Sequence, residues 1–350
     1  MKVQNLKRAS EELFTRKEDE RCESLQNMAE RCRVKKAASQ DRWESPKNIH
    51  TIAEEIISTR GPELRFIAGS DGYYINDWSF SQLCRMSGIA KDTVNRLSPD
   101  TATRVFKETL PRKGEKPLQI FTEDDVVRSI HGTAYTRLWD LDVVNVLREF
   151  AVDFQPPQKG FNGATGLYVG EQDMFAFMID PNGWCEIGDD AFAPGFFTWN
   201  SEVGRRSLGI QTFWFQAVCA NHIVWDATEV VEWTRKHTAN IKNGLSEVRS
   251  IIAGLVQKRD ERKDGFHRLI KKAMEEKLGD DAEEAMKMLT KNGIGRSLAQ
   301  QALKIAEENG RFTIWSLVDA LTRLSRDQVN AGDRLEMDGK AAGLLQLVEV

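Results

Sequence analysis

Cysteine, proline and long apolar runs are all scarce in this 350-residue chain. No apolar run approaches the roughly 18–20 residues that a membrane-spanning helix needs. The first twenty residues contain Lys and Arg but no apolar segment typical of a secretory signal. The chain has five cysteines, an odd number without a C-x-x-C pair, which argues against a disulfide scaffold: Cys22, Cys32, Cys84, Cys185 and Cys219. We therefore expect a cytoplasmic protein with no membrane partner.

An excess of charge of one sign is also lacking. The 49 Lys and Arg residues nearly balance the 53 Asp and Glu residues, giving a net charge of −4. This balance excludes a uniformly basic nucleic-acid coat and a wholly disordered acidic chain. The 41% of apolar residues can form a substantial core. At about 100–200 residues per domain, the length fits one large domain or two smaller ones.

The common motifs for nucleotide binding and hydrolysis are absent as well. No glycine pair precedes a Lys in the order of a phosphate-binding loop, and neither G-x-S-x-G nor H-E-x-x-H occurs. Gly293 and Gly295 match the first two glycines of a dinucleotide-binding turn, but the third is missing and the stretch lies between expected helices. We expect no resident cofactor and assign no catalytic residue.

Two groups of possible metal ligands are better explained without a metal. Cys219 and His222 have half of a zinc-site spacing, but residues three apart on a strand point to opposite faces. A cluster of acidic residues does not follow the order of a calcium-binding loop: Asp180, Glu186, Asp189 and Asp190. We interpret these residues as a buried thiol, a strand-end histidine and surface carboxylates, and expect no metal site.

The hydrophobic pattern divides the chain into three parts. Residues 1–45 are charged and poor in apolar residues, which predicts a solvated helical or disordered arm. Residues 46–235 begin with an expected amphipathic helix at 49–58, then show a hairpin signal at Gly69–Gly72 and many short strands. Residues 236–350 have helical periodicity. Strands followed by helices predict the α+β class, with helices packed on an antiparallel sheet and a helical C-terminal part.

Two helical patterns each allow two interpretations. One stripe has the 4-3-4-3 spacing of a single helix face, and it suits either a buried seam or a contact in a homo-oligomer: Ile241, Leu245, Val248, Ile252 and Leu255. Residues 80–97 resemble a helix-turn-helix around Gly88, but any two packed short helices give similar spacing.

Basic residues are unevenly distributed in this nearly neutral chain. Between Arg235 and Lys272 there are eleven Lys and Arg against four Asp and Glu, whereas residues 120–200 have four against thirteen. Such asymmetry suits a nucleic-acid phosphate backbone, although a solvated helix face explains it equally well. The candidate nucleic-acid-binding residues are Arg205, Arg206, Lys258, Arg259, Arg262 and Lys263.

Two polar segments carry a resemblance to a known family. One runs from Val127 to Asp140, and the other combines Asn-Ser-Glu-x-Gly at Asn200–Gly204 with Cys-x-Asn at Cys219–Asn221. They resemble phage/plasmid-like proteins that share a domain of unknown function (domain of unknown function 932), over about residues 64–324. The matching positions are Arg128, Tyr135, Arg137, Asp140, Asn200, Ser201, Glu202, Gly204, Cys219 and Asn221.

The resemblance implies carriage by phages, plasmids or genomic islands and names no reaction. The Asn-Ser-Glu trio suits a tight turn whose side chains cap backbone groups. Alternatively, Glu202 lines a ligand groove together with Arg205 and Arg206.

The leading functional hypothesis is a non-enzymatic nucleic-acid-binding accessory protein of a mobile element, with a role in DNA replication or recombination. Two alternatives stay open: a metal-dependent enzyme of nucleic-acid or nucleotide metabolism, and a structural phage or plasmid component that oligomerises through the 241–255 stripe.

Overall fold

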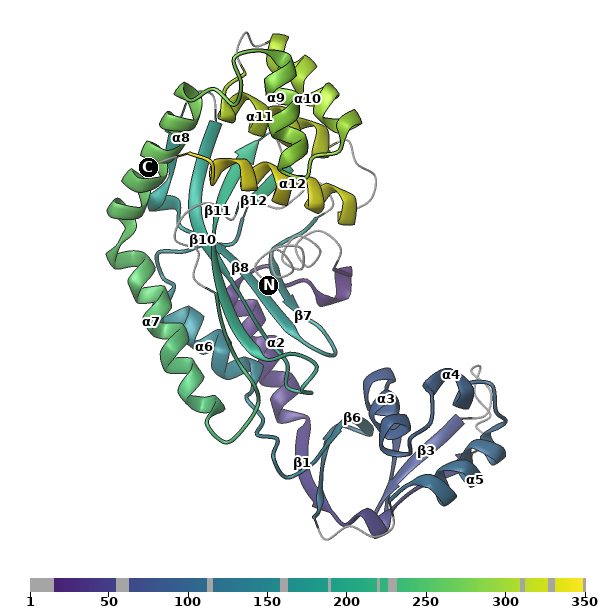
Figure 1. The fold of residues 1–350 in the computed structure, drawn as a ribbon. Helices are drawn as coiled ribbons and strands as arrows, with labels where there is room; N and C mark the ends of the chain where they lie inside the picture. The colour runs from purple at the N-terminus through teal and green to yellow at the C-terminus, as the bar shows by residue number, and fades with distance from the viewer. Residues whose placement is uncertain are drawn as a thin grey trace.

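Among the described residues, the protein forms two β-sheets with groups of helices packed on them (Figure 1). The computed structural model describes residues 16–54, 63–111, 116–157, 163–187, 190–218, 221–225, 232–308, 312–326 and 331–348. A smaller lobe contains the first sheet, and a larger body contains the second sheet with the C-terminal helices. The expected α+β class is confirmed, but with two sheets instead of one.

The smaller sheet has six strands among the described residues, in the order β1-β5-β6-β4-β3-β2. Only β4 and β6 run parallel. The strands are β1 (Ser39–Glu44), β2 (Ile49–Glu54), β3 (Glu63–Ala68), β4 (Asp71–Ile75), β5 (Leu118–Glu123) and β6 (Val126–His131). The helices α3 (Asp77–Met86), α4 (Lys91–Val94) and α5 (Pro99–Thr109) complete this lobe, and Phe66, Leu83 and Phe106 lie fully buried in its core.

The amphipathic helix expected at residues 49–58 is wrong for the part that the structure describes. Ile49 and Thr51 are buried while His50 and Ile52 are exposed, which is the alternation of a strand. β2 pairs with β3 over its whole length, so pairing overrides the local helical preference. The β3–β4 hairpin at Gly69 is confirmed.

The larger sheet consists mainly of antiparallel strands in the order β12-β11-β10-β8-β7, with β13 on β11 and β9 on β10. Its strands are β7 (Leu167–Val169), β8 (Met174–Ile179), β9 (Cys185–Ile187), β10 (Asp190–Asn200), β11 (Leu208–Val218), β12 (Asn221–Trp225) and β13 (Glu232–Arg235). Along β8, Met174 and Met178 face one core cluster, while Phe175 and Phe177 face another. Both faces of this sheet are therefore apolar.

Three helices pack on the first of these faces: α2 (Leu25–Ala37), α6 (Asp140–Phe150) and α7 (Gly244–Gln257), the last preceded by a short turn at Ile241–Asn243. The stripe of residues 241–255 lies in this contact. Ile241, Val248 and Ile252 are fully buried within the chain, and Leu245 is partly buried beside them. The stripe is thus an internal seam, and a homo-oligomer would need a different surface.

The solvated arm expected over residues 1–45 needs correction where the structure describes it. In α2, Met28 and Cys32 are buried against the large sheet and α6, and β1 pairs with β5. A few apolar side chains on an otherwise charged helix suffice to attach it, because Lys and Arg cover the outer side. Residues 1–15 lie outside the described residues.

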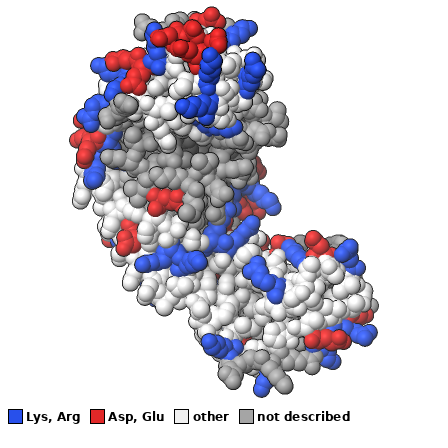
Figure 2. Space-filling view, in the orientation of Figure 1, with Lys and Arg blue, Asp and Glu red and all other residues white. Residues whose placement is uncertain are grey.

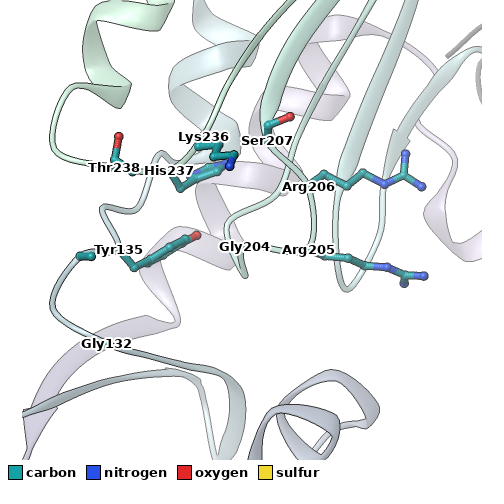
Figure 3. Close-up of a pocket in the computed structure, with 10 residues that line it drawn as sticks. Gly132, Tyr135, Gly204, Arg205, Arg206, Ser207, Lys236, His237 and Thr238 are labelled. Atoms are coloured by element: carbon teal, nitrogen blue, oxygen red, sulfur yellow. The ribbon is translucent and has the colours of Figure 1, made fainter. Parts of the chain in front are cut away.

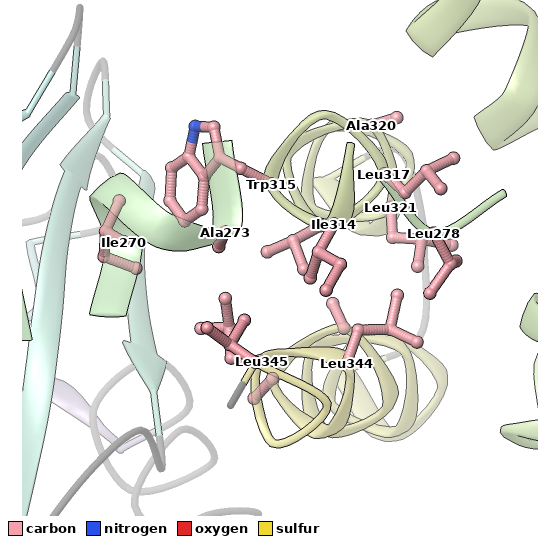
Figure 4. Close-up of a cluster of buried hydrophobic side chains, with 14 of the residues drawn as sticks. Ile270, Ala273, Leu278, Ile314, Trp315, Leu317, Ala320, Leu321, Leu344 and Leu345 are labelled. Carbon is pink, nitrogen blue, oxygen red and sulfur yellow. The ribbon is translucent and has the colours of Figure 1, made fainter. Parts of the chain in front are cut away.

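The C-terminal helices form a separate layer at the end of the large sheet (Figure 1). They are α8 (Arg259–Glu275), α9 (Ala282–Lys291), α10 (Arg296–Glu308), α11 (Ile314–Arg326) and α12 (Ala331–Leu345). Figure 4 shows Ile314, Leu321 and Leu345 in the apolar cluster between these helices. Two aromatic side chains of the sheet, Phe192 and Trp214, join the same cluster and fix the bundle to the sheet.

The helix-turn-helix resemblance corresponds to α3 and α4, of which α4 is only four residues long. Lys91 of α4 forms an ion pair with Asp77 of α3, and Val94 packs into the core of the smaller lobe. The second helix thus serves packing in an α+β lobe. No described helix is both long enough and apolar enough to cross a lipid bilayer.

Candidate functional site

A pocket of about 460 Å³ lies where the loop after β6 meets two segments of the large sheet (Figure 3). The first of these segments is the turn between β10 and β11, and the second follows β13. The lining residues are Gly132, Ala134, Tyr135, Gly204, Arg205, Arg206, Ser207, Lys236, His237 and Thr238. The size lies within the about 300–1,000 Å³ range of small-molecule sites.

The turn at Gly204 needs a residue without a side chain. Its φ is +70°, in the left-handed region that favours glycine. A Cβ atom there would lie 2.7 Å from Cε1 of His131 and 2.9 Å from Cε2 of Tyr135. The Ser201 hydroxyl accepts a hydrogen bond from the backbone N–H of Arg205 at 3.0 Å. The predicted capping role of the polar trio is therefore seen for Ser201.

Three stacked rings lie at the pocket, and two of them, Tyr135 and His237, line it. The Tyr135 ring lies between two imidazoles, with its centroid 3.7 Å from that of His131 and 5.4 Å from that of His237. The Tyr135 hydroxyl donates to the carbonyl oxygen of Glu202 at 2.7 Å. Nε2 of His131 lies 3.0 Å from the carbonyl oxygen of Val203. The stack thus connects the smaller lobe to the turn between β10 and β11.

Both imidazoles are neutral at physiological pH. Burial lowers the pKa of His131 to about 3 and that of His237 to about 4, because the charged form loses its hydration. Only 7% of His237 is exposed, and neither ring nitrogen has a hydrogen bond of good geometry among the described residues, although the backbone of Thr136 and Arg206 lies near the ring. A buried polar group without a partner costs about 1–3 kcal/mol.

Glu202 lies outside the pocket lining and has a different role. Its side chain is buried, and Oε1 accepts a hydrogen bond from the backbone N–H of Asp140 at 2.9 Å. Asp140 is the first residue of α6, and Trp139 before it provides no capping side chain. Glu202 therefore caps this helix from a distant part of the chain. Of the predicted groove residues, only Arg205 and Arg206 line the pocket.

Asn200 and Asp140 continue the same buried network. The Asn200 amide donates to Oδ1 of Asp140 at 2.8 Å and to the carbonyl oxygen of Leu138 at 3.0 Å. Burial, together with the nearby carboxylate of Glu202, raises the pKa of Asp140 well above its ordinary value. The structure thus joins three residues of the resemblance motif, Asp140, Asn200 and Glu202, from two distant segments into one hydrogen-bonded unit.

Arg137 joins this network to β1. Its guanidinium donates to both carboxylate oxygens of Asp41, at 2.8 and 2.6 Å, and to the carbonyl oxygen of Glu202. It also lies 3.6 Å from the centroid of the Phe121 ring. A bidentate, stacked arginine of this kind orients two segments relative to each other.

The two arginines that line the pocket have different partners. Arg205 is exposed, and its guanidinium donates to the neutral side chain of Gln172. The guanidinium of Arg206 forms an ion pair with Asp173 at 2.7 Å, and that carboxylate also binds Arg16. In Figure 3 both side chains extend away from Tyr135 and His237. They continue the basic surface from the pocket toward the turn between β7 and β8.

Arg128 lines a second cavity of about 500 Å³, between the β5–β6 turn and the start of the described chain. It is buried, pairs with Glu123 and donates to the carbonyl oxygen of Glu171. Burial lowers the pKa of Lys35 in the same cavity, where its ammonium donates to the carbonyl oxygen of Gly170 at 2.6 Å. Acidic and basic residues alternate around this cavity, so its lining has no single sign of charge.

Two of the four candidate nucleic-acid-binding residues at the start of α8, Arg259 and Arg262, make contacts within the protein. The guanidinium of Arg259 binds Asp180 at 2.5 Å and Asp153 at 2.9 Å. Arg262 is buried, with its guanidinium 5.9 Å from the centroid of the Trp214 ring. Of the four residues, Lys258 is exposed and Lys263 is partly exposed. Packing of α8 against the sheet thus leaves Lys258 and Lys263 more accessible than Arg259 and Arg262.

Some predicted residues cannot be placed. Cys219 lies outside the described residues, as does the side chain of Asn221. Within the part of the chain that the structure describes, no three His, Cys, Asp or Glu side chains gather as metal ligands would. Asp180 accepts from the backbone N–H of Asn182 and binds Arg259.

The sequence interpretation did not single out His131, Lys236 or His237, which belong to the site. Lys236 belongs to the basic segment 235–272, but the candidate binding residues of that segment were chosen from the long helix that follows it. The segment 236–238 is a polar loop directly after a strand, and such loops are where binding residues concentrate. The position of this polar loop after a strand is the feature of the sequence that could have indicated a binding residue.

A comparison with protein-family models shows the family to which the chain belongs. The model described as Domain of unknown function (DUF932) matches residues 127–325, which is more than half of the chain. The chain belongs to this family. The DUF932 region begins in β6 and includes the ring stack, the Glu202 network and every residue that lines the pocket. No curated protein and no solved structure gives a match.

Proposed function

We propose that this DUF932 protein is a non-enzymatic nucleic-acid-binding accessory protein of a phage, plasmid or genomic island, acting in the cytoplasm during DNA replication or recombination. One observation carries the proposal. The pocket lining includes three basic residues, Arg205, Arg206 and Lys236, and no acidic residue. A concave surface with one sign of charge attracts polyanions.

Two of these cations are available to a ligand. Lys236 is exposed and forms no ion pair among the described residues, and Arg205 hydrogen-bonds to an uncharged amide. Phosphate oxygens are stronger acceptors for Arg205 than the amide of Gln172, because the resulting contact is charge-assisted. Arg205 and Lys236 are therefore the residues expected to contact a phosphate backbone.

The distribution of charge over the surface supports the same location. On the face shown in Figure 2, Lys and Arg side chains gather where the smaller lobe meets the larger body. At the opposite end of the molecule, over the helical bundle, a group of Asp and Glu side chains lies among Lys and Arg side chains. The cations at the junction would attract a polyanion to this part of the surface.

The mobile-element context rests on the resemblance of the Asn200–Gly204 and Val127–Asp140 segments to phage/plasmid-like proteins. Gene neighbourhood tests it independently of binding. Recombinase or replication genes beside this gene would support the proposal, whereas capsid genes would favour a structural component.

The direct test is a titration of a labelled single-stranded oligonucleotide and of a duplex, followed by fluorescence anisotropy at several salt concentrations. Each phosphate contact should contribute a log–log slope of about −0.7 for a single strand or −0.9 for a duplex. Little dependence on base sequence is expected, since cations on phosphates position a strand without reading it. Absence of binding at low salt would contradict the proposal.

A further inference from the structure

The pocket contains a buried hydrogen-bonding group that the fold itself does not satisfy. His237 lines the pocket with only 7% of its surface exposed; neither ring nitrogen has a hydrogen bond of good geometry, and the nearest polar groups of the described chain are the backbone of Thr136 and Arg206. Figure 3 shows it beside Lys236 and near Ser207 and Thr238. A ligand that provides an acceptor at this point would compensate the cost of burying the ring.

The side chains around His237 are donors. Lys236 adds an ammonium group with three donors, and Ser207 and Thr238 add hydroxyl groups. No carboxylate lines the pocket to compete for them. The backbone of Thr136 and Arg206 lies close enough to His237 to favour its charged form, in opposition to burial. An anion on the pocket side would favour that form further, and the imidazolium could then donate from both nitrogens.

The positive charge in and beside the pocket exceeds the single negative charge of an internal phosphodiester. A diester has one negative charge, whereas a terminal phosphate has about −1.5 to −2 and three strong acceptor oxygens. Arg205 and Lys236 together provide two positive charges without a carboxylate partner among the described residues. The charge in and beside the pocket therefore matches a phosphomonoester better than a diester.

We infer that this pocket binds a phosphomonoester, through Lys236 and His237 with the hydroxyls of Ser207 and Thr238. The inference rests on the proposed function in taking the end of a nucleic-acid strand as the source of that group. A free mononucleotide carries the same chemistry, and the experiment separates the two.

The test compares one oligothymidine with a 5′-phosphate, with a 3′-phosphate and with neither, by anisotropy at fixed salt. Thymidine monophosphate and inorganic phosphate serve as competitors. A terminal phosphate at one end should tighten binding by about 10-fold or more, in line with a charge-assisted contact. Thymidine monophosphate should compete, and inorganic phosphate should compete more weakly.

Two variants assign the effect to the pocket. His237→Phe keeps a buried ring and removes both nitrogens. Thr238→Ala changes an exposed side chain, so this substitution should leave the fold intact. Both should reduce the preference for the phosphorylated strand, measured as the ratio of the two affinities within the same variant. Lys258→Gln, directly before α8, is the control and should keep the preference.

The outcomes distinguish this inference from the proposed function. Equal, salt-dependent binding of all three strands would overturn the inference and leave the proposed function intact. Binding of thymidine monophosphate without binding of any strand would support the phosphomonoester site and contradict the nucleic-acid role. If neither binds, both proposals fail.

Discussion

The carboxylate of Glu202 accepts a hydrogen bond from the backbone N–H of Asp140, at 2.9 Å and across a sequence separation of 62 residues. This contact joins two distant segments of the DUF932 region and caps α6 at its first residue. It also holds the loop before α6 against the turn that lines the pocket. The network is therefore the structural support of the proposed binding surface.

Glu202→Ala is expected to destabilise the protein. The change leaves the N–H of Asp140 buried without an acceptor, and such a group costs about 1–3 kcal/mol. Urea denaturation followed by circular dichroism measures the loss. Glu186→Ala is the matched control, because Glu186 is exposed on β9. Equal midpoints for the two variants would show that the cap contributes nothing to stability.

Gly204→Ala should be destabilising by about 2 kcal/mol or more. An alanine at φ +70° costs about 1–2 kcal/mol, and its Cβ would also contact the His131 and Tyr135 rings below 3.0 Å. Gly254→Ala provides the contrast, because Gly254 lies inside α7 and a Cβ there meets no atom within 4 Å. That variant should be stabilised by about 0.5–1 kcal/mol. A reversed order of melting temperatures would disprove the strained turn.

His237 should make stability depend on pH. Its pKa falls from 6.5 to about 4 on folding, so the unfolded chain binds the proton first as pH decreases. The stabilisation is complete above about pH 6.5 and is lost progressively as pH falls toward 4. From about pH 7 to pH 5, His237 alone should reduce the free energy of unfolding by about 2 kcal/mol.

Chemical denaturation of the wild type and of His237→Gln over that range measures this dependence. The raised pKa of Asp140 acts with the opposite sign, but it is present in both proteins and cancels in the difference. His237→Gln should show a shallower decrease of stability than the wild type. Parallel curves would mean that folding does not lower the pKa of His237.

Arg259→Gln tests whether α8 uses its basic residues for the fold. The substitution leaves the carboxylate of Asp180 buried, 2% exposed, without its ion-pair partner. Removal of one member of such a pair costs about 3–5 kcal/mol when it is fully buried, and less here because Arg259 is partly exposed. Lys258→Gln, one position earlier and exposed, should leave the midpoint unchanged. Equal stability of the two variants would restore the nucleic-acid interpretation of this helix.

Much of the fold could be predicted from the sequence, since periodicity reports burial. The stripe from Ile241 to Leu255 and the hairpin at Gly69 both follow from spacing and turn residues. The helical prediction at 49–58 was wrong because strand pairing with β3 decided the structure of Ile49–Glu54. The sequence of α2 suggests a solvated helix because only three of its side chains, Met28, Ala29 and Cys32, are buried, and so few positions give a weak hydrophobic pattern.

The site was predicted in part. The resemblance selected Asp140, Asn200 and Glu202, which the structure brings together, but it did not show that Glu202 caps a helix instead of lining a groove. Charge counting favoured α8, because a sequence cannot tell a solvated arginine from Arg259, which is bound to two carboxylates. His237 could not be found by counting, since its importance comes from the three segments that surround it in space.

The most direct test of the proposed function compares two double variants in salt-dependent binding of single-stranded DNA. Arg205→Gln with Lys236→Gln removes the two cations that the structure leaves available beside the pocket. Lys258→Gln with Lys263→Gln removes the same charge from α8. The pocket variant should reduce the log–log salt slope by up to about 1.4, at about 0.7 per phosphate, and the α8 variant should change it little. Equal slopes for both variants and the wild type would contradict binding at this pocket.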